Sequence, residues 1–322
     1  MKRRHLLQAA SAALVLPGIA RAQSYPVKPI RYIVPVAAGG GNDMIARVVT
    51  ERWGRLLGQS FLVDNQSGGG GVVACQVTAR AGPDGYTLMQ GYVATHGTTP
   101  ATRRVSYDAI KDFTPIGMIG ATPNVLAIND NVPAKNVNEF IEYIKRNPGK
   151  VNYGSAGAGS LTHMTMELFK QETGALMLHI PYRGIAPAIN DLLGGQTQAM
   201  FPGLAAALPH LRSGRMRALA VTGKQRSPQL KDIPTMEEIG FKGFDAMQWY
   251  GSVGPAGMSA AVVQRLNEAQ VAVLKLPDLA DKLAGEAVEP WPMTPEQFGL
   301  YIRSEVERWT ALAKARGIRL EE

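Results

Sequence analysis

A strand, a glycine-rich loop and a helix follow one another near the start of the chain, and this order restricts the folds available to it. The strand is Ile30–Val34, and the loop Ala37–Gly41 follows it. Asn42 is placed to act as an N-cap. Apolar residues then recur at helical spacing as far as Leu57, where Gly58 ends the helix. Such a unit is typical of α/β proteins.

The same order occurs again in the second half of the chain. Val151–Gly154 predicts a strand, Ser155–Gly159 a loop, and Ser160 opens a helix that continues to about Glu172. The repetition predicts an α/β protein with largely parallel sheets. A chain of 322 residues is also long enough for two domains.

Further strands and helices alternate along the chain. The predicted strands are Phe61–Asp64, Tyr86–Gly91, Val125–Ile128, Leu178–Pro181, Thr197–Phe201, Met216–Thr222 and Gln248–Val253. The predicted helices run through Cys75 to Arg80 and over Val137–Arg146, Ala186–Leu193, Leu204–Arg212, Ala260–Leu276 and Pro295–Arg316. No low-complexity linker occurs between residues 120 and 250. We therefore expect two α/β lobes that are joined by short crossings near Ala121–Val125 and Ala246–Gly251. The expected domains are residues 23–123 plus 250–322, and residues 124–249.

Residues 1–22 predict an export signal. Lys2, Arg3 and Arg4 precede the apolar run Leu6–Ala20, and Ala20-Arg21-Ala22 has the small-x-small form of a cleavage site. We expect cleavage after Ala22 and an exported mature protein that begins at Gln23. The paired arginines are compatible with both Sec and twin-arginine export. The apolar run spans 15 residues, fewer than the roughly 20 that span a membrane.

Charge and cysteine content exclude several classes of protein. The formal net charge is +8, but four of the 34 basic residues and no acid lie in the leader. The mature chain therefore keeps 30 basic against 26 acidic residues, a net charge of +4. The basic residues are scattered and form no stripe with aromatics, so no nucleic-acid partner is expected. Cys75 alone forms neither a disulfide framework nor a four-cysteine metal site.

Common catalytic motifs are missing from the sequence. Gly149-Lys150 and Gly223-Lys224 are not followed by the Ser or Thr of a P-loop, and the glycine loops lack the dinucleotide-binding order. No zincin helix or nucleophile elbow is present. No cofactor or metal is expected, and the missing motifs leave no recognisable catalytic centre, although they do not by themselves exclude an enzyme. An exported enzyme that uses Asp43, His163 and Arg183 stays open as an alternative, as does a binding module that signals to a partner protein.

The two glycine loops predict an anion site, one part in each lobe. Backbone N–H groups at a helix start lack partners within the helix, and the helix dipole adds about half a positive charge there. Carboxylates and phosphates are favoured at such positions. Arg183 is interpreted either as a carboxylate clamp or as a solvated residue of the cleft rim. Trp249-Tyr250 is interpreted as a wall of the cleft or as packing.

The chain resembles the extracytoplasmic solute receptors of the tripartite tricarboxylate transporter family, also called Bug-type receptors. The resemblance extends over nearly the whole mature chain. It is carried by Pro29–Pro35, Ala37–Asp43, Pro83–Leu88, Lys111–Ile116, Tyr153–Ser160 with His163 and Glu167–Phe169, Pro181–Gly184 with Ala186–Ala188, Asp191–Gln196, Arg217–Thr222 and Ile233–Thr235. Departures from the family pattern occur at Asn65–Gly71, Thr98–Ala101 and Phe201-Pro202-Gly203, where the family commonly has Phe-Asp.

The resemblance implies a fold like that of type II periplasmic binding proteins, with two α/β lobes, two crossing strands and a ligand cleft between the lobes. It implies that the protein captures a small carboxylated solute and delivers it to an inner-membrane permease of the tripartite tricarboxylate type. We expect a monomer. The expected ligand-binding residues are Ala37, Ala38, Gly39, Gly40, Asn42, Asp43, Ser155, Ala156, Gly157, Gly159, Ser160, His163, Tyr182, Arg183 and Gly184.

Overall fold

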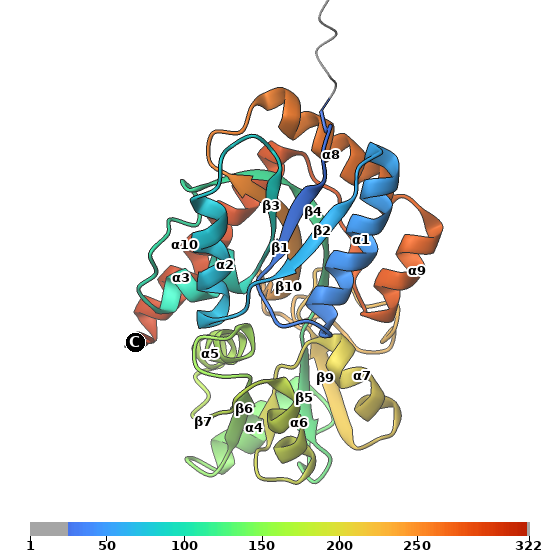
Figure 1. Cartoon of the computed structure of the whole chain (residues 1–322). Coiled ribbons are helices and arrows are strands. Elements are labelled where there is room, and N and C mark those ends of the chain that lie inside the picture. The colour runs from blue at the N-terminus through green and yellow to red at the C-terminus, as the bar shows by residue number, and fades with distance from the viewer. Residues whose placement is uncertain (1–24, 321–322) are drawn as a thin grey trace, which may run out of the picture.

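A computed structural model describes residues 25–320, so the leader at residues 1–22 lies outside it. The described chain forms two lobes, each built on one sheet with helices packed around it (Figure 1). The first sheet has the order β11-β4-β10-β3-β1-β2, and the second has the order β7-β6-β8-β5-β9. The strands are β1 Ile30–Val34, β2 Phe61–Asn65, β3 Thr87–Tyr92, β4 Phe113–Pro123, β5 Val125–Asn129, β6 Asn152–Ser155, β7 Leu178–Pro181, β8 Ala199–Met200, β9 Met216–Val221, β10 Met247–Pro255 and β11 Glu289–Pro290.

Both sheets are mixed, so the prediction of largely parallel sheets is wrong. The parallel pairs are β1 with β2 and β3, and β6 with β7 and β8. Strand β10 runs antiparallel to β3 and β4, and β5 runs antiparallel to β8 and β9. Strand β10 follows the return of the chain from the second lobe, and it enters the first sheet in the direction opposite to its neighbours.

The helices agree with most of the predicted ranges. They are α1 Gly41–Leu57, α2 Val72–Ala79, α3 Thr99–Thr102, α4 Val137–Arg146, α5 Leu161–Thr173, α6 Ile185–Leu193, α7 Leu204–Arg212, α8 Ala260–Leu274, α9 Pro277–Gly285 and α10 Pro295–Ala315, with the short helical turns η1 Gly69–Gly71 and η2 Ala94–Thr98. The N-cap of α1 is Gly40 and not Asn42. Gly40 has the extended backbone of an N-cap, whereas Asn42 already lies within the first helical turn.

Strand β4 is the longest strand of the described chain, and the sequence did not reveal it. Its segment holds Pro115, Gly117 and Gly120, which favour turns in isolation. Close packing explains two of these residues. A Cβ atom on Gly117 would meet the Asn267 side chain at 2.6 Å, and one on Gly120 would meet the Glu289 carbonyl at 2.5 Å. Neighbouring elements thus approach the strand too closely for larger residues.

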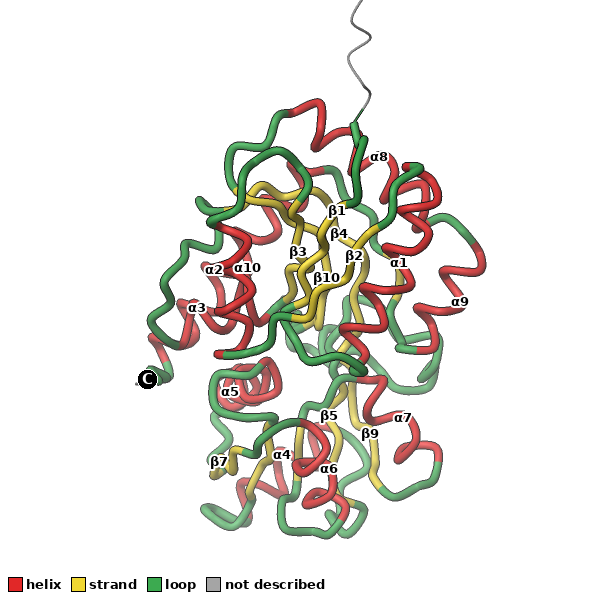
Figure 2. Tube along the Cα trace, in the orientation of Figure 1, coloured by secondary structure: helices red, strands yellow, loops and turns green. Residues whose placement is uncertain are grey.

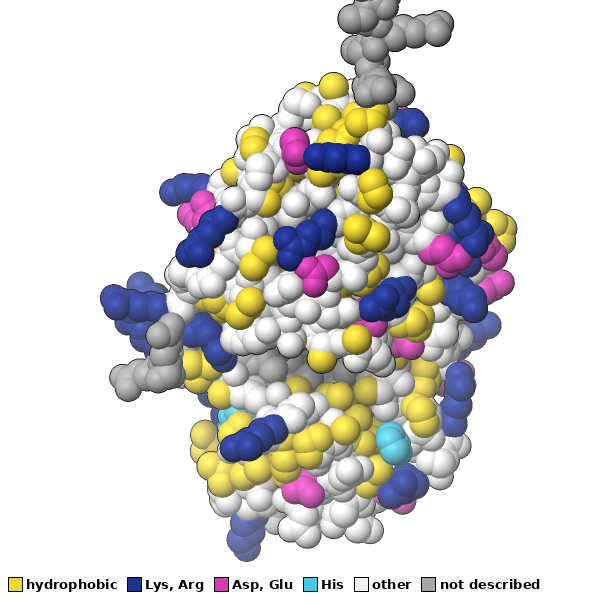
Figure 3. Space-filling view, viewed as in Figure 1, with side chains coloured by type: hydrophobic (Ala, Val, Ile, Leu, Met, Phe, Trp, Pro, Cys, Tyr) yellow, Lys and Arg dark blue, Asp and Glu magenta, His cyan; other side chains and the backbone are white. Residues whose placement is uncertain are grey.

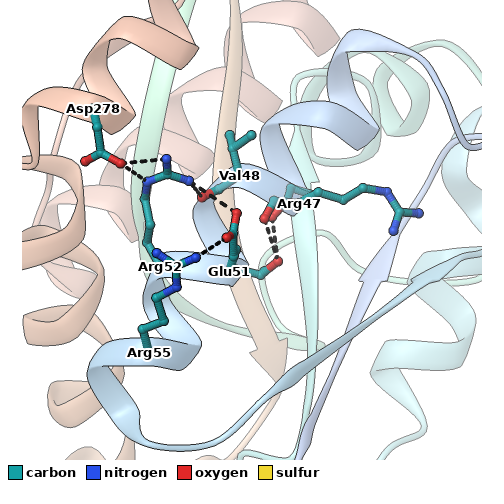
Figure 4. Close-up of polar contacts among 8 residues, drawn as sticks. Arg47, Val48, Glu51, Arg52, Arg55 and Asp278 are labelled. Atoms are coloured by element: carbon teal, nitrogen blue, oxygen red, sulfur yellow. Dashed lines mark hydrogen bonds and ion pairs between the residues drawn. The ribbon is translucent and has the colours of Figure 1, made fainter.

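Helix α9 was also missed, because the predicted helix Ala260–Leu276 stops at Leu274 and a new helix starts at Pro277. An arginine holds α9 against α1 (Figure 4). Arg52 donates from Nε and Nη2 to Asp278 Oδ2 at 2.9 and 2.6 Å, and from Nη1 to the Val48 carbonyl at 3.0 Å. This contact fixes the start of α9 beside the middle of α1.

The two lobes are joined where the chain crosses between the sheets. Strand β4 ends at Pro123 and β5 begins at Val125, so the first crossing lies at Asn124. Thr222 Oγ1 accepts the Asn124 N–H at 2.9 Å and donates to the Ala246 carbonyl at 2.7 Å. The outgoing and returning segments are therefore hydrogen bonded to one residue.

Apolar clusters fill both lobes, and one of them packs Leu161 and Met164 of α5 against Trp249 and Trp309 of the first lobe. The distribution of charge on the surface agrees with the sequence analysis. Cys75 lies on α2, within the predicted helix, and is buried. Lys and Arg side chains are scattered among acidic ones over the face drawn in Figure 3, without a continuous basic stripe. No helix within residues 25–320 has the length and apolarity needed to cross a membrane.

Candidate functional site

A cleft of about 380 Å³ lies where the two lobes face each other. Helix α5 of the second lobe lies at this boundary (Figure 2). The start of α1 from the first lobe and the start of α5 from the second both contribute to the cleft. Its lining consists of Gly41, Asn42, Tyr92, Val93, Ala94, Thr122, Asn124, Ala156, Ser160, Leu161, Thr162, Ile185, Gly203, Ala205, Ala206, Gln248, Tyr250 and Glu286.

The start of α1 presents open hydrogen-bond donors to the cleft. The first helical hydrogen bond joins the Met44 N–H to the Gly40 carbonyl at 3.0 Å, so the N–H groups of Gly41 and Asn42 precede it. Within the described chain neither N–H group has a hydrogen-bond partner. The buried Oδ1 atom of Asn42 also lacks a partner there. The two N–H groups are available to an anion or to water, whereas the Asn42 Oδ1 atom can accept a hydrogen bond only from a donor.

Asp43 organises the first glycine loop. Its carboxylate is buried and accepts hydrogen bonds from Gly39 N at 2.9 Å, Arg47 Nε at 3.0 Å and Asn65 Nδ2 at 2.9 Å. Burial alone would raise the pKa of Asp43, but these hydrogen bonds outweigh it and lower the pKa below its usual value. The acid is thus fully engaged within its own lobe, and the structure places it outside the cleft lining, along with the exposed residues Ala37–Gly40.

The second glycine loop uses most of its N–H groups internally. Ala156 N donates to Thr162 Oγ1 at 2.8 Å, Gly157 N to Ser155 Oγ at 3.2 Å, and Gly159 N to His163 Nδ1 at 3.0 Å. The prediction that these loop N–H groups point outward unpaired is therefore wrong. Polar side chains of the loop and of the first helical turn satisfy them.

The open donors of the second lobe lie one step further along the chain. Ser160 caps α5, because its Oγ accepts the His163 N–H. The N–H groups of Leu161 and Thr162 follow the cap and find no partner among residues 25–320. Both residues line the cleft. The helix start, and not the glycine loop before it, supplies the donors on this side.

His163 contacts the second glycine loop without lining the cleft. Its ring stacks on His179 with the centroids 3.9 Å apart, and His179 Nε2 lies 2.6 Å from Ser155 Oγ. Burial lowers the pKa of each histidine to about 4, so both rings are neutral at pH 7. His163 does not line the cleft, and its visible role is to accept the Gly159 N–H.

The remaining predicted site residues, Tyr182, Arg183 and Gly184, lie beside the cleft. Tyr182 donates its hydroxyl proton to Asp191 at 2.6 Å, and Arg183 is exposed. Gly184 is the N-cap of α6, and the next residue, Ile185, enters the cleft lining. Contact of Tyr182, Arg183 and Gly184 with a ligand stays a prediction.

Of the predicted site residues, the structure brings Asn42, Ala156 and Ser160 together in the cleft lining. Gly157 and Gly159 line an adjoining cavity of about 670 Å³, which Ala156 and Ser160 also touch. Of Trp249-Tyr250, which the sequence left open as wall or packing, Tyr250 lines the cleft and Trp249 is buried. Several other lining residues were missed. These are Tyr92, Val93, Ala94, Thr122, Asn124, Gln248 and Glu286.

A larger groove of about 790 Å³ lies elsewhere, between α10 and the segment that follows α3. Its lining includes Arg103, Arg104, Lys314 and Arg319, but none of the residues at the starts of α1 and α5. The 380 Å³ cleft, and not this groove, receives the two helix starts that follow the glycine loops, and it is therefore the candidate site. Within the described residues no group of three or more His, Cys, Asp or Glu side chains is arranged to hold a metal ion.

Comparison with known proteins agrees with this architecture. The family described as "Tripartite tricarboxylate transporter family receptor" matches residues 45–318. The protein BugT of Bordetella pertussis is 33% identical over 318 residues, which cover 97% of this chain and 96% of BugT. A solved structure described as a periplasmic transporter is 40% identical with a TM-score of 0.80, over 92% of this chain and 100% of that one. An R. palustris protein solved with adipate is 34% identical with a TM-score of 0.80, over 92% and 99% of the two chains.

Proposed function

The chain belongs to the tripartite tricarboxylate transporter receptor family, and we propose that it captures a small carboxylated solute between the starts of α1 and α5. The observation that carries this proposal is the convergence of two helix N-termini, one from each lobe, on a single cleft. Each N-terminus contributes open N–H donors and about half a positive charge. The R. palustris relative was solved with adipate, which is a carboxylate.

Binding drives closure of the lobes in this proposal. A ligand shifts a conformational equilibrium only by the difference between its affinities for the two states. A carboxylate that touches both helix starts makes its full set of contacts only when the lobes are close together. The connecting segments at Asn124 and Ala246 are the natural place for the movement, because Thr222 is hydrogen bonded to both.

Several finer properties belong to the same proposal. We infer cleavage of the leader after Ala22, a periplasmic monomer, and transfer of the solute to an inner-membrane permease of the tripartite tricarboxylate type. We also infer that the protein catalyses no reaction. The relative described as a periplasmic transporter supports the compartment. The engagement of Asp43 within its own lobe and the neutral His163 argue against an acid and base pair that acts on the ligand.

A melting screen tests the proposed function. The protein, freed of co-purified ligand by unfolding, washing and refolding, is heated with mono-, di- and tricarboxylates, amino acids and aromatic acids. A true ligand at about 100 times its Kd adds roughly 2.7 kcal/mol to the free energy of unfolding and raises the melting temperature. A response to uncharged solutes alone contradicts the proposal. Conversion of a bound acid into a new compound would instead favour the enzyme alternative.

A further inference from the structure

Glu286 is an acid that enters a cleft otherwise suited to anions. It follows the last residue of α9, and its carboxylate lies against Gly41 at the start of α1. Helix α9 is held along α1 by the contact between Arg52 and Asp278, so the position of Glu286 is set by two packed helices (Figure 4). The residue is half-buried and lines the cleft.

No cation of the described chain neutralises Glu286. The ion pairs and hydrogen bonds formed within residues 25–320 do not include its carboxylate. The cleft lining contains no Lys, Arg or His, which makes Glu286 the one charged side chain in it. The pKa of Tyr250 is raised above its usual value, mainly by burial and next by the negative charge of Glu286. The charge of Glu286 therefore acts on a neighbouring residue of the cleft lining.

An independent polar group in the same lining also lacks a partner. Thr122 is 3% exposed, and its Oγ1 atom has no hydrogen-bond partner among the described residues. It faces Gln248 across the pair of strands β4 and β10, and both residues line the cleft. A buried hydroxyl without a partner is costly, and a polar ligand group removes this cost. The part of the cleft lined by Thr122 and Gln248 can therefore hydrogen bond to a polar or charged group of a ligand.

The charges of the cleft distinguish between classes of carboxylate. The two helix starts supply together about one positive charge, and Glu286 supplies one negative charge, so the empty cleft is close to neutral. A dicarboxylate would add two negative charges to this site, and a simple monocarboxylate would add one. A carboxylate that also carries an ammonium group adds no net charge, and it offers Glu286 the partner that a partly buried acid requires.

We propose that Glu286 makes the cleft select carboxylates that also carry an ammonium group. The ligand carboxylate lies at the open N–H groups of the helix starts, and its ammonium group pairs with Glu286. This inference rests on the proposed function and specifies its substrate class. If Glu286 only neutralised the start of α1, it would have no influence on which carboxylate binds.

Calorimetric titration with matched acids tests the inference. One set is 6-aminohexanoate, 2-aminohexanoate, hexanoate and adipate, and a second is 4-aminobutanoate, 2-aminobutanoate, butanoate and succinate. We expect an amino member of at least one set to bind at least tenfold more tightly than its monocarboxylate and dicarboxylate counterparts. Glu286→Gln should reduce this preference at least tenfold and improve relative binding of the dicarboxylate.

Two further variants separate charge from folding. Glu286→Asp keeps the charge and should retain the preference for the amino acid. Glu289→Gln removes an acid three residues away that is exposed and outside the cleft lining, and it should leave all affinities unchanged. Each variant must unfold at the wild-type midpoint in urea.

The outcomes are distinguishable. Preference for a dicarboxylate or simple monocarboxylate, or an amino-acid preference that survives Glu286→Gln, overturns the inference and leaves the proposed function standing. Binding of no carboxylate in either set, together with a silent melting screen, overturns both.

Discussion

Replacing Glu167 with alanine is expected to lower the free energy of unfolding by about 3–5 kcal/mol, as is typical when one partner of a buried charge network is removed. Glu167 lies on α5 and is 5% exposed. Its carboxylate accepts hydrogen bonds from Tyr153 Oη at 2.6 Å, Lys170 Nζ at 2.6 Å and Arg316 Nε at 2.8 Å. The substitution would leave two cations and a buried hydroxyl without their partner.

The pKa of Glu167 supports this expectation. Burial alone would raise it, but the hydrogen bonds from Lys170, Tyr153 and Arg316 outweigh burial and lower it to about 2. A carboxyl whose pKa is depressed in the folded state contributes stability above its unfolded value of about 4.5. That contribution is lost as the pH falls from about 5 towards 2. The wild-type protein should therefore lose stability over this range, and the alanine variant should lose less.

Urea unfolding at pH 7 measures the effect. Glu172→Ala is the matched control, because Glu172 lies on the same helix but is exposed, and it should change the free energy of unfolding by no more than about 0.5 kcal/mol. Equal stability of the two variants would show that the network contributes nothing. Because Arg316 follows α10 while Glu167 lies on α5, the variant also loses a contact between the C-terminal helix and the second lobe.

Replacing Ala156 with phenylalanine should weaken carboxylate binding at least 100-fold, equivalent to about 2.7 kcal/mol. Ala156 is half-buried and lines both the cleft and the adjoining cavity, so a benzyl group added there fills space that the solute would occupy. The backbone N–H of Ala156 donates to Thr162 Oγ1, and the substitution preserves this donor. The loss is expected in affinity with little change in stability.

Titration with the strongest carboxylate from the melting screen provides the measurement. Ala261→Phe adds the same group at an exposed position on α8 and should bind like the wild type. If Ala156→Phe binds the acid with wild-type affinity, the solute does not occupy this cleft.

The sequence predicted elements that have strong local signals. Helix α4 matches its predicted range, because apolar residues recur at helical spacing and Asn136 caps it. Strand β4 and helix α9 lacked such signals. Gly117 and Gly120 of β4 reflect close packing by α8 and β11, which no local pattern records. The antiparallel direction of β10 likewise depends on the return of the chain from the other lobe.

The candidate site was predicted only in its general position. The glycine loops located the starts of α1 and α5. In the second loop, however, Thr162 Oγ1 and His163 Nδ1 accept the hydrogen bonds of the loop N–H groups, so the open donors lie in the first helical turn. Thr122 and Glu286 join the cleft through pairing and packing between segments distant in sequence. Glu286 in particular follows a helix that the sequence did not reveal.

A crystal structure of the protein with the carboxylate that stabilises it most tests the central claim directly. We expect one carboxylate of the ligand in the 380 Å³ cleft, with its oxygens within about 3 Å of the N–H groups of Leu161 or Thr162 and of Gly41 or Asn42. A ligand held by one lobe alone, or seated in the groove beside α10, would contradict the claim that the two helix starts together form the binding site.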